Sequence, residues 1–313
     1  MKACRVRFNK LFSNAIFRKP LYMKDIKEIS VIGLGLLGGS ISLAALRSFS
    51  TIKVTGYSHR SSTRNKARRL AISSNVIDCI QKSVPRADLV ILATPIITFE
   101  SIFSEIADSL QSGCIVTDVG STKALPHRWA AKNLPKNVHY IGSHPIAGSE
   151  QRGIEFARDD LFEGAMCILT TTKSTNKHVV LTMKNFWSKL GCSVKLMTPT
   201  QHDRIFANVS HVPHITAAAL INANNNEELK FAGKGFIDTS RIASGPPNIW
   251  SDVMLTNVKN TSKGIDKIIA ELNKIKKAIQ KENKQEIERL LTAARKKRSI
   301  LIKYKYKKKE LIS

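Results

Sequence analysis

Four segments of the sequence combine side chains that can transfer protons or bind anions with the glycines and prolines typical of loops. They are residues 118–123 (DVGSTK), 142–150 (GSHPIAGSE), 210–214 (SHVPH) and 235–241 (GFIDTSR). An imidazole is a suitable proton acceptor near neutral pH, and the planar guanidinium of arginine matches a carboxylate. The four segments therefore contain candidates for catalysis and for binding an anionic substrate.

The histidines in these segments also have ordinary interpretations. A single histidine after a strand is more often structural than catalytic. His211 and His214 have a spacing that can hold a metal ion, and His202 and Asp203 are close in sequence. A metal ion needs further ligands of matching type and geometry, however, and Pro213 interrupts a regular helix. No metal site is expected.

A glycine-rich turn near the start of the chain indicates a dinucleotide site. The apolar residues 29–32 lead into Gly33-x-Gly35-x-x-Gly38, and residues 40–47 can form a helix. Such glycines allow a tight turn and close approach to a pyrophosphate, while the helix N-terminus faces the phosphates. The predicted cofactor contacts are Gly33, Leu34, Gly35, Leu36, Leu37 and Gly38, with Thr94 and Pro95 after a later strand. The alternative is a strand-to-helix turn without a ligand.

The residues after the second predicted strand favour NADP over NAD. An NAD site usually has an acidic residue about 20 positions beyond the glycines. Ser58 stands at that position, twenty residues beyond Gly38, and His59 and Arg60 follow it. Neutral donors and an arginine suit a 2′-phosphate better than a ribose diol. The alternative is a solvent-exposed turn whose arginine contacts nothing.

Strand and helix patterns alternate up to about residue 199 and predict an α/β fold with a Rossmann-type, doubly wound and mostly parallel sheet. The expected strands are residues 29–32, 52–57, 88–93, 114–119, 138–142, 165–170 and 193–196. The expected helices are residues 40–47, 62–73, 99–110 and 176–190. The candidate residues that follow strands are therefore expected at one edge of the sheet, where open sheets bind ligands.

Helical periodicity replaces the strand pattern after residue 200. Isoleucines and leucines at helical spacing between residues 265 and 279, and again between 287 and 294, predict two amphipathic helices that pack together or form a dimer surface. The predicted organisation is a basic extension (1–24), a dinucleotide-binding domain (25–199), an all-α substrate and dimerisation domain (200–302) and a basic tail (303–313).

The composition and charge limit the classes of protein to which the chain can belong. The 313 residues carry a formal net charge of +26, with seven Lys or Arg and no acidic residue in residues 1–24. No nucleic-acid-binding motif accompanies this charge, so we interpret it as solvated surface and expect neither a nucleic acid nor a membrane partner. The basic start fits equally a transit-type peptide or a disordered extension. Five scattered cysteines and no long apolar run suggest a cytoplasmic protein.

Taken in order, six motifs resemble the prephenate/arogenate dehydrogenase family over residues 28–280. They are GLGLLGGS (33–40), ATP (93–95), DVGSTK (118–123), GSHPIAGSE (142–150), SHVPH (210–214) and GFIDTSRIASGPPNIWSD (235–252). β-Hydroxyacid dehydrogenases and pyrroline carboxylate reductases share only the first glycines and the sheet. The paired prolines Pro246 and Pro247 depart from the family pattern, which often has an acidic or polar residue before a single proline.

The resemblance implies NAD(P)-dependent oxidative decarboxylation of prephenate or arogenate in tyrosine biosynthesis by a homodimer. It assigns catalysis to His144, which would draw off the hydroxyl proton, and to its partner Ser121. It places Arg241 on a substrate carboxylate. The other residues implied to bind or enclose the substrate are His211, His214, Asp238 and Glu150.

Two rival functions remain open on the sequence. A β-hydroxyacid dehydrogenase would need a catalytic lysine on a helix of the second domain, and no convincing one is present. A cofactor-sensing nucleic-acid-binding protein would use the basic ends of the chain and bind with a steep salt dependence. The sequence does not distinguish prephenate from arogenate, which differ by a keto or an amino group.

Overall fold

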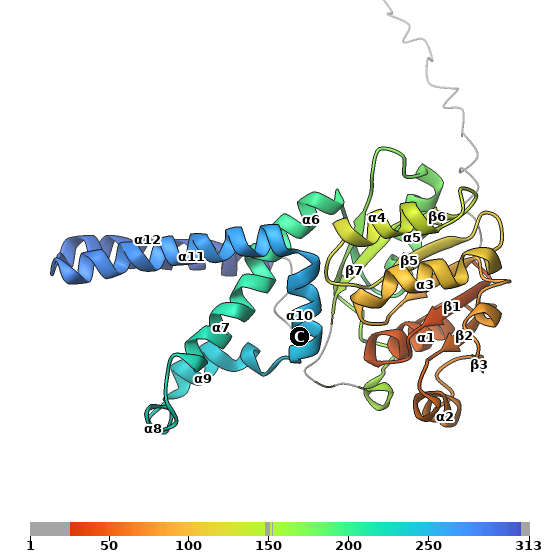
Figure 1. Cartoon of the computed structure of the whole chain (residues 1–313), viewed down its shortest axis with the longest axis horizontal. Coiled ribbons are helices and arrows are strands. Elements are labelled where there is room, and N and C mark those ends of the chain that lie inside the picture. The colour runs from red at the N-terminus through yellow and green to blue at the C-terminus, as the bar shows by residue number, and fades with distance from the viewer. Residues whose placement is uncertain (1–25, 148–150, 152, 308–313) are drawn as a thin grey trace, which may run out of the picture.

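The computed structural model describes residues 26–147, 151 and 153–307, so Glu150 and the basic N-terminal extension lie outside the described residues. An α/β part is followed by a helical part, and a long helical hairpin projects away from the α/β part (Figure 1). No helix of the described residues is long and apolar enough to span a bilayer.

A six-stranded parallel sheet has the order β3-β2-β1-β4-β5-β6. Its strands are β1 (Glu28–Ile32), β2 (Lys53–Tyr57), β3 (Asn75–Ile77), β4 (Leu89–Leu92), β5 (Ile115–Asp118) and β6 (His139–Tyr140). The strand order reverses between the neighbouring strands β1 and β4. The connections that follow these two strands run to opposite sides, which leaves a crevice at the carboxyl ends of the strands. This topology confirms the predicted doubly wound fold.

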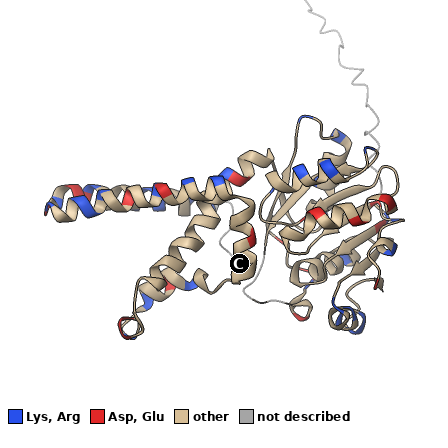
Figure 2. Ribbon diagram, in the orientation of Figure 1, with Lys and Arg blue, Asp and Glu red and all other residues tan. Residues whose placement is uncertain are grey.

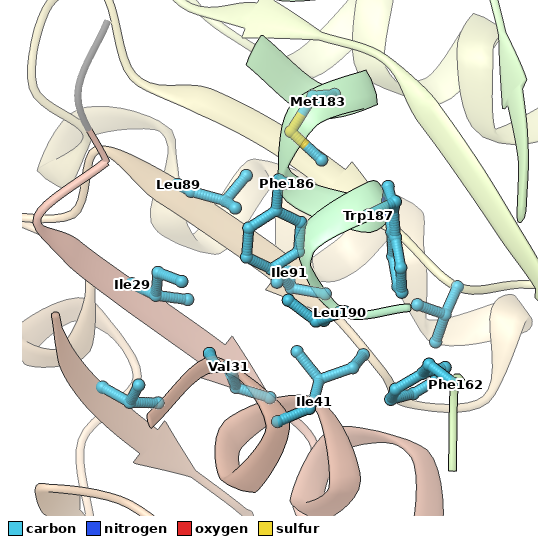
Figure 3. Packing of buried hydrophobic residues seen from close by; sticks show 14 of the residues in the cluster. Ile29, Val31, Ile41, Leu89, Ile91, Phe162, Met183, Phe186, Trp187 and Leu190 are labelled. Atoms are coloured by element: carbon cyan, nitrogen blue, oxygen red, sulfur yellow. The ribbon is translucent and has the colours of Figure 1, made fainter. Parts of the chain in front are cut away.

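Helices cover both faces of this sheet, whose central strands β1, β4 and β5 are almost completely buried. Figure 3 shows one face, where Ile29, Val31 and Ile91 pack near Phe186 and Trp187. The helices of the α/β part are α1 (Leu36–Ser48), α2 (Ser61–Arg69), α3 (Phe99–Ile106), α4 (Ala124–Asn133) and α5 (Lys177–Lys189). Short 3₁₀ turns are η1 (Gln81–Ser83), η2 (Ile96–Thr98), η3 (Ala107–Ser109) and η4 (Ile154–Phe156).

The last three strands form a separate sheet, which the alternating pattern did not predict. Strand β7 (Gly142–Ile146) pairs antiparallel with β8 (Met166–Thr170), which pairs parallel with β9 (Ser193–Met197). Ser143 anchors β7 against the main sheet, because its Oγ lies 2.7 Å from Thr117 Oγ1 and accepts a 3.0 Å bond from the indole of Trp187. The separate sheet matters because β7 carries His144.

The helical part starts at α6 (Pro199–Phe206), which continues through a π-helical segment η5 (Ala207–His211) into α7 (Val212–Asn222). It then comprises α8 (Asn226–Leu229), α9 (Lys234–Ser240), the 3₁₀ turn η6 (Arg241–Ser244), α10 (Pro247–Thr256), α11 (Val258–Gln280) and α12 (Lys284–Lys307). Helices α11 and α12 contain the two predicted apolar stripes and form the projecting hairpin (Figure 1). Ile269, Leu272 and Ile279 of α11 remain exposed.

Basic side chains are distributed over both parts of the molecule. Figure 2 shows Lys and Arg along the hairpin and on α2 and α4, with acidic residues interspersed on the hairpin. Ion pairs such as Lys274–Glu271 and Arg289–Glu286 connect opposite charges there. Helix α12 extends to Lys307, into the segment predicted as a basic tail.

Candidate active site

A cavity of about 690 Å³ lies between the α/β part and the helical part. From the α/β part it is lined by Gly35, Leu36, Leu37, Ala93, Thr94, Pro95, Ile96, Val119, Gly120, Ser121, Gln151 and Gly153. From the helical part it is lined by Arg241, Ile242, Ser244, Gly245, Pro246, Ile249, Trp250, Asp252 and Val253. The cavity thus combines the predicted edge of the sheet with the segment that contains Arg241.

The glycine turn has the shape that a dinucleotide phosphate requires. Gly33 has φ +104°, and a Cβ there would lie 2.6 Å from the backbone of Ala93. A Cβ on Gly38 would overlap the carbonyl of Gly33, whereas nothing lies within 4 Å of a Cβ built on Gly35. Helix α1 begins at Leu36 without a side-chain cap, so its first N–H groups face this open space. The turn therefore fits a pyrophosphate.

The end of β2 lies beside the glycine turn, since Gly33 donates a 2.8 Å bond to the carbonyl of Tyr57. Ser58 is buried, whereas His59 and Arg60 are exposed at the start of α2. The guanidinium of Arg64 donates to the carbonyls of Ser58 and His59 at 2.7 and 3.0 Å. Arg64 thus shapes this turn, a role that the sequence did not suggest.

A buried ion pair holds the loop that carries Ser121. Asp118 and Lys123 are fully buried and paired with each other. Asp118 also accepts bonds from the hydroxyl of Tyr140 at 2.6 Å and from the backbone N–H of Gly120 at 2.7 Å. Removing either charge would leave the other buried without a partner, so the pair fixes the loop strongly. Ser121 thereby lies at the wall of the cavity.

His144 is connected to the helical part through a row of hydrogen bonds. Its Nδ1 lies 2.8 Å from Nε2 of His202, and Nδ1 of His202 lies 2.8 Å from Oδ1 of Asp203. Asp203 in turn accepts backbone N–H bonds from Lys123 and Ala124 at 2.7 and 2.8 Å. The ring of Phe206 packs on both histidine rings, with centroids 4.9 and 4.4 Å away.

These histidines are neutral at pH 7. Burial, with smaller contributions from His202 and the cation of Lys123, holds the pKa of His144 well below its usual value. Burial and Lys123 likewise lower the pKa of His202 to about 2. A neutral imidazole at residue 144 has a free lone pair and can accept a proton.

The rings of His211 and His214 both lie close to Trp250, which lines the cavity. The ring of His214 stacks on Trp250 with centroids 3.7 Å apart and an interplanar angle of 10°, and His211 meets it edge-on at 6.5 Å. Both histidines are buried, and burial lowers the pKa of His211 to about 4. His211 Nε2 and His214 Nδ1 have no hydrogen-bond partner among the described residues.

The structure brings only some of the predicted site residues to the cavity wall. Gly35, Leu36, Leu37, Thr94, Pro95, Ser121 and Arg241 line it. The other glycine-turn residues, Gly33, Leu34 and Gly38, lie behind this wall. Asp238 is exposed on α9 and is not among the lining residues. Within the described part of the chain, no group of three or more potential metal ligands is present.

Two functional features were missed by reasoning from single motifs. In the sequence His202 and Asp203 stand out only as neighbours of His211 and His214, but in the structure His202 contacts His144 and Asp203 contacts His202. Lys123 belongs to the DVGSTK motif, and the structure buries its ammonium against Asp118. No local sequence pattern signals either feature, because each depends on contacts between segments that are far apart in the chain.

Two family models match the chain. One is described as "Prephenate dehydrogenase, nucleotide-binding domain" and matches residues 42–196; the other is "Prephenate dehydrogenase, dimerization domain" and matches residues 198–293. The prephenate dehydrogenase of Bacillus subtilis (strain 168) is 33% identical over 87% of this chain and 75% of its own length. The cyclohexadienyl dehydrogenase of Zymomonas mobilis subsp. mobilis is 32% identical over 82% of this chain and 90% of its own.

Solved structures of similar proteins have the same fold. Prephenate dehydrogenase from Aquifex aeolicus, in complex with hydroxyphenyl propionate and NAD⁺, has a TM-score of 0.83 at 33% identity. The comparison covers 88% of this chain and 99% of that one. Synechocystis arogenate dehydrogenase has a TM-score of 0.77 at 29% identity, with the same coverage of 88% and 99%.

Proposed function

The chain belongs to the prephenate/arogenate dehydrogenase family, and we propose that His144 is the base of its reaction. The protein is an oxidoreductase that catalyses nicotinamide-dependent oxidative decarboxylation of prephenate or arogenate in tyrosine biosynthesis. The observation that carries the proposed role of His144 is the 2.8 Å hydrogen bond between its Nδ1 and Nε2 of His202, and burial lowers the pKa of its imidazole. A base must be unprotonated at the working pH, and this one is.

In the proposed mechanism, His144 accepts the proton of the substrate's ring hydroxyl. A bound nicotinamide supplies the hydride acceptor for the hydroxyl-bearing carbon. The bond to the ring carboxylate then breaks, carbon dioxide leaves, and the electron pair enters the ring, which becomes aromatic. The phenolic oxygen takes a proton back from His144, so the base is regenerated. Atoms and charges balance without a further reactant.

Ser121 and Arg241, which line the cavity, have separate proposed roles; His144 is not among the lining residues. The hydroxyl of Ser121 would hydrogen-bond the reacting oxygen and keep it close to the cofactor. Arg241 would bind a substrate carboxylate, because its planar guanidinium can donate two parallel hydrogen bonds. We also propose that His211 and His214 shape the substrate pocket through Trp250, that Asp238 orients nearby groups, and that Glu150, which lies outside the described residues, is a gating residue.

The proposed cofactor is NADP. Residues 58–64, which follow β2, contain no acidic side chain, and the exposed Arg60 comes three residues after Tyr57, whose carbonyl accepts a hydrogen bond from Gly33 of the glycine turn. A ribose 2′-phosphate bound there would carry two negative charges. Arg64, by contrast, is hydrogen-bonded to the backbone of its own turn. Arg60 is therefore the more available of the two arginines for a phosphate.

The proposed assembly is a homodimer formed through the helical part. A dimerisation-domain model matches residues 198–293, and Ile269, Leu272 and Ile279 leave an apolar strip exposed on α11.

We also propose a reducing, cytoplasmic location. Cys79, Cys114, Cys167 and Cys192 are all free thiols, as expected in such a compartment.

A spectrophotometric assay of the purified protein tests the proposed chemistry. Prephenate and arogenate would each be supplied with NADP and with NAD, and reduced cofactor and carbon dioxide would be measured. We expect equal amounts of the two products with at least one substrate, and a lower KM for NADP than for NAD. Formation of no reduced cofactor in any of the four combinations would overturn the proposal.

A further inference from the structure

In the hydrogen-bonded row His144–His202–Asp203, the state of Asp203 determines which nitrogen carries the hydrogen in each bond. Each carboxylate oxygen of Asp203 already accepts a backbone N–H, one from Lys123 and one from Ala124. A carboxylate held by donors in this way is an acceptor toward His202 as well, so the hydrogen in the 2.8 Å contact belongs to Nδ1 of His202.

The state of His202 then determines the state of His144. His202 is a neutral ring whose Nδ1 carries the hydrogen, so its Nε2 is a bare acceptor. Nδ1 of His144 lies 2.8 Å from this atom and must carry the hydrogen of that bond. A neutral His144 therefore has its lone pair on Nε2.

We propose that His202 and Asp203 are positioning residues that fix the tautomer of His144 and so make Nε2 the reactive atom. This inference rests on the proposed function of His144 as the base. The arrangement resembles the carboxylate that orients a catalytic histidine in serine proteases, with a second imidazole inserted between the two groups.

The burial of the pair is difficult to explain by stability alone. His202 is 0% and Asp203 is 1% exposed, and apolar side chains of similar size would fill this space without the penalty of burying polar groups. Every side-chain nitrogen and oxygen of the pair has a partner. One further bond, from the Asn257 amide to the backbone carbonyl of Asp203 at 2.8 Å, fixes the helix that carries them.

The row also makes the base depend on how the two parts dock. His144 is on β7 of the α/β part, whereas His202 and Asp203 are on α6 of the helical part. Asp203 is held in turn by the start of α4, back in the α/β part. The tautomer of His144 is therefore fixed only when α6 contacts both β7 and the start of α4.

Two substitutions of His202 separate this role from simple packing. His202→Gln keeps the order of groups, since its amide oxygen can accept from His144 and its NH₂ can donate to Asp203. His202→Phe fills the space but removes the acceptor. The exposed His178→Gln, on α5, is the matched control. The full-length protein would be labelled with ¹⁵N-histidine, and the His144 signals would be assigned by comparison with His144→Asn.

We expect a protonated Nδ1 and an unprotonated Nε2 at His144 in the wild type, His202→Gln and His178→Gln proteins. In His202→Phe we expect mixed tautomers and a kcat lowered about 10- to 100-fold, with the Kd of the cofactor unchanged. His202→Gln should recover most of that loss. A hydrogen on Nε2 of His144 in the wild type, or an unchanged tautomer in His202→Phe, would overturn the inference. A correct tautomer in a protein inactive with both substrates would overturn the proposed function and leave this inference standing.

Discussion

The imidazole of His214 stacks on the indole of Trp250, with ring centroids 3.7 Å apart and planes inclined by 10°. The two residues come from α7 and α10, and Gly245 makes their close approach possible, because a Cβ there would lie 2.9 Å from Cε1 of His214. Trp250 lines the cavity and His214 does not. The buried His214 therefore helps to fix the position of Trp250 at the cavity wall.

Loss of this stack should weaken substrate binding. An aromatic pair contributes about 0.5–1.5 kcal/mol beyond its buried area, so His214→Ala should raise the substrate KM about two- to tenfold with a smaller change in kcat. His214→Phe keeps a ring on Trp250 and should keep the KM near that of the wild type. Equal KM increases in the two variants would show that a ring nitrogen, and not the stack, is what matters.

Arg241→Lys should raise the substrate KM at least about tenfold although it keeps the positive charge. An ammonium cannot reproduce the two parallel hydrogen bonds of a guanidinium to a carboxylate, and a hydrogen bond to a charged group contributes about 1.5–3 kcal/mol. Initial rates at saturating cofactor measure the change. Arg128→Lys, an exposed arginine on α4, is the matched control. A KM unchanged in Arg241→Lys would remove Arg241 from the carboxylate site.

Arg60→Ala should weaken the binding of NADP about tenfold or more and leave the binding of NAD nearly unchanged. The physical reason is that only NADP has a 2′-phosphate for the guanidinium to bind. Fluorescence titration of the reduced cofactors gives both dissociation constants, and Arg69→Ala at the far end of α2 is the control. An equal loss for the two cofactors would contradict the proposed preference.

The pH profile should reflect the buried state of His144. Burial and the nearby Lys123 lower its pKa, so the ring stays neutral as the pH falls through about 6.5, where an exposed histidine becomes half protonated. The acid limb of kcat/KM should therefore lie below about pH 6.5. Measurement of kcat/KM at pH values above and below 6.5 shows whether the pKa of His144 is shifted downward, as expected. An acid limb above that pH would show that the base is not buried as described.

Much of the site follows from one rule about parallel sheets. The glycine turn, Thr94 with Pro95, and Ser121 each follow a strand, and the carboxyl ends of parallel strands meet at one edge. Their convergence at the cavity could thus be predicted from strand patterns alone. The apolar stripes of α11 and α12 could be predicted for a different reason, since each is a local helical periodicity in the sequence.

The remaining features depend on contacts between distant segments. The antiparallel pairing of β7 depends on Ser143 meeting Thr117 and Trp187, which are 26 and 44 residues away in the chain. The contact between His144 and His202 spans 58 residues and two structural parts. No local pattern encodes such distances, which explains why the hydrogen-bonded row from His144 to Asp203 could not be predicted from the sequence.

Replacement of the proposed base tests the account most directly. His144→Asn preserves a polar side chain of modest size but removes the imidazole, so kcat should fall about 100-fold or more, as expected for loss of a general base. The Kd of NADP, measured by fluorescence on the same preparation, should stay at the wild-type value. Turnover close to that of the wild type in a protein that binds cofactor normally would contradict the role of His144.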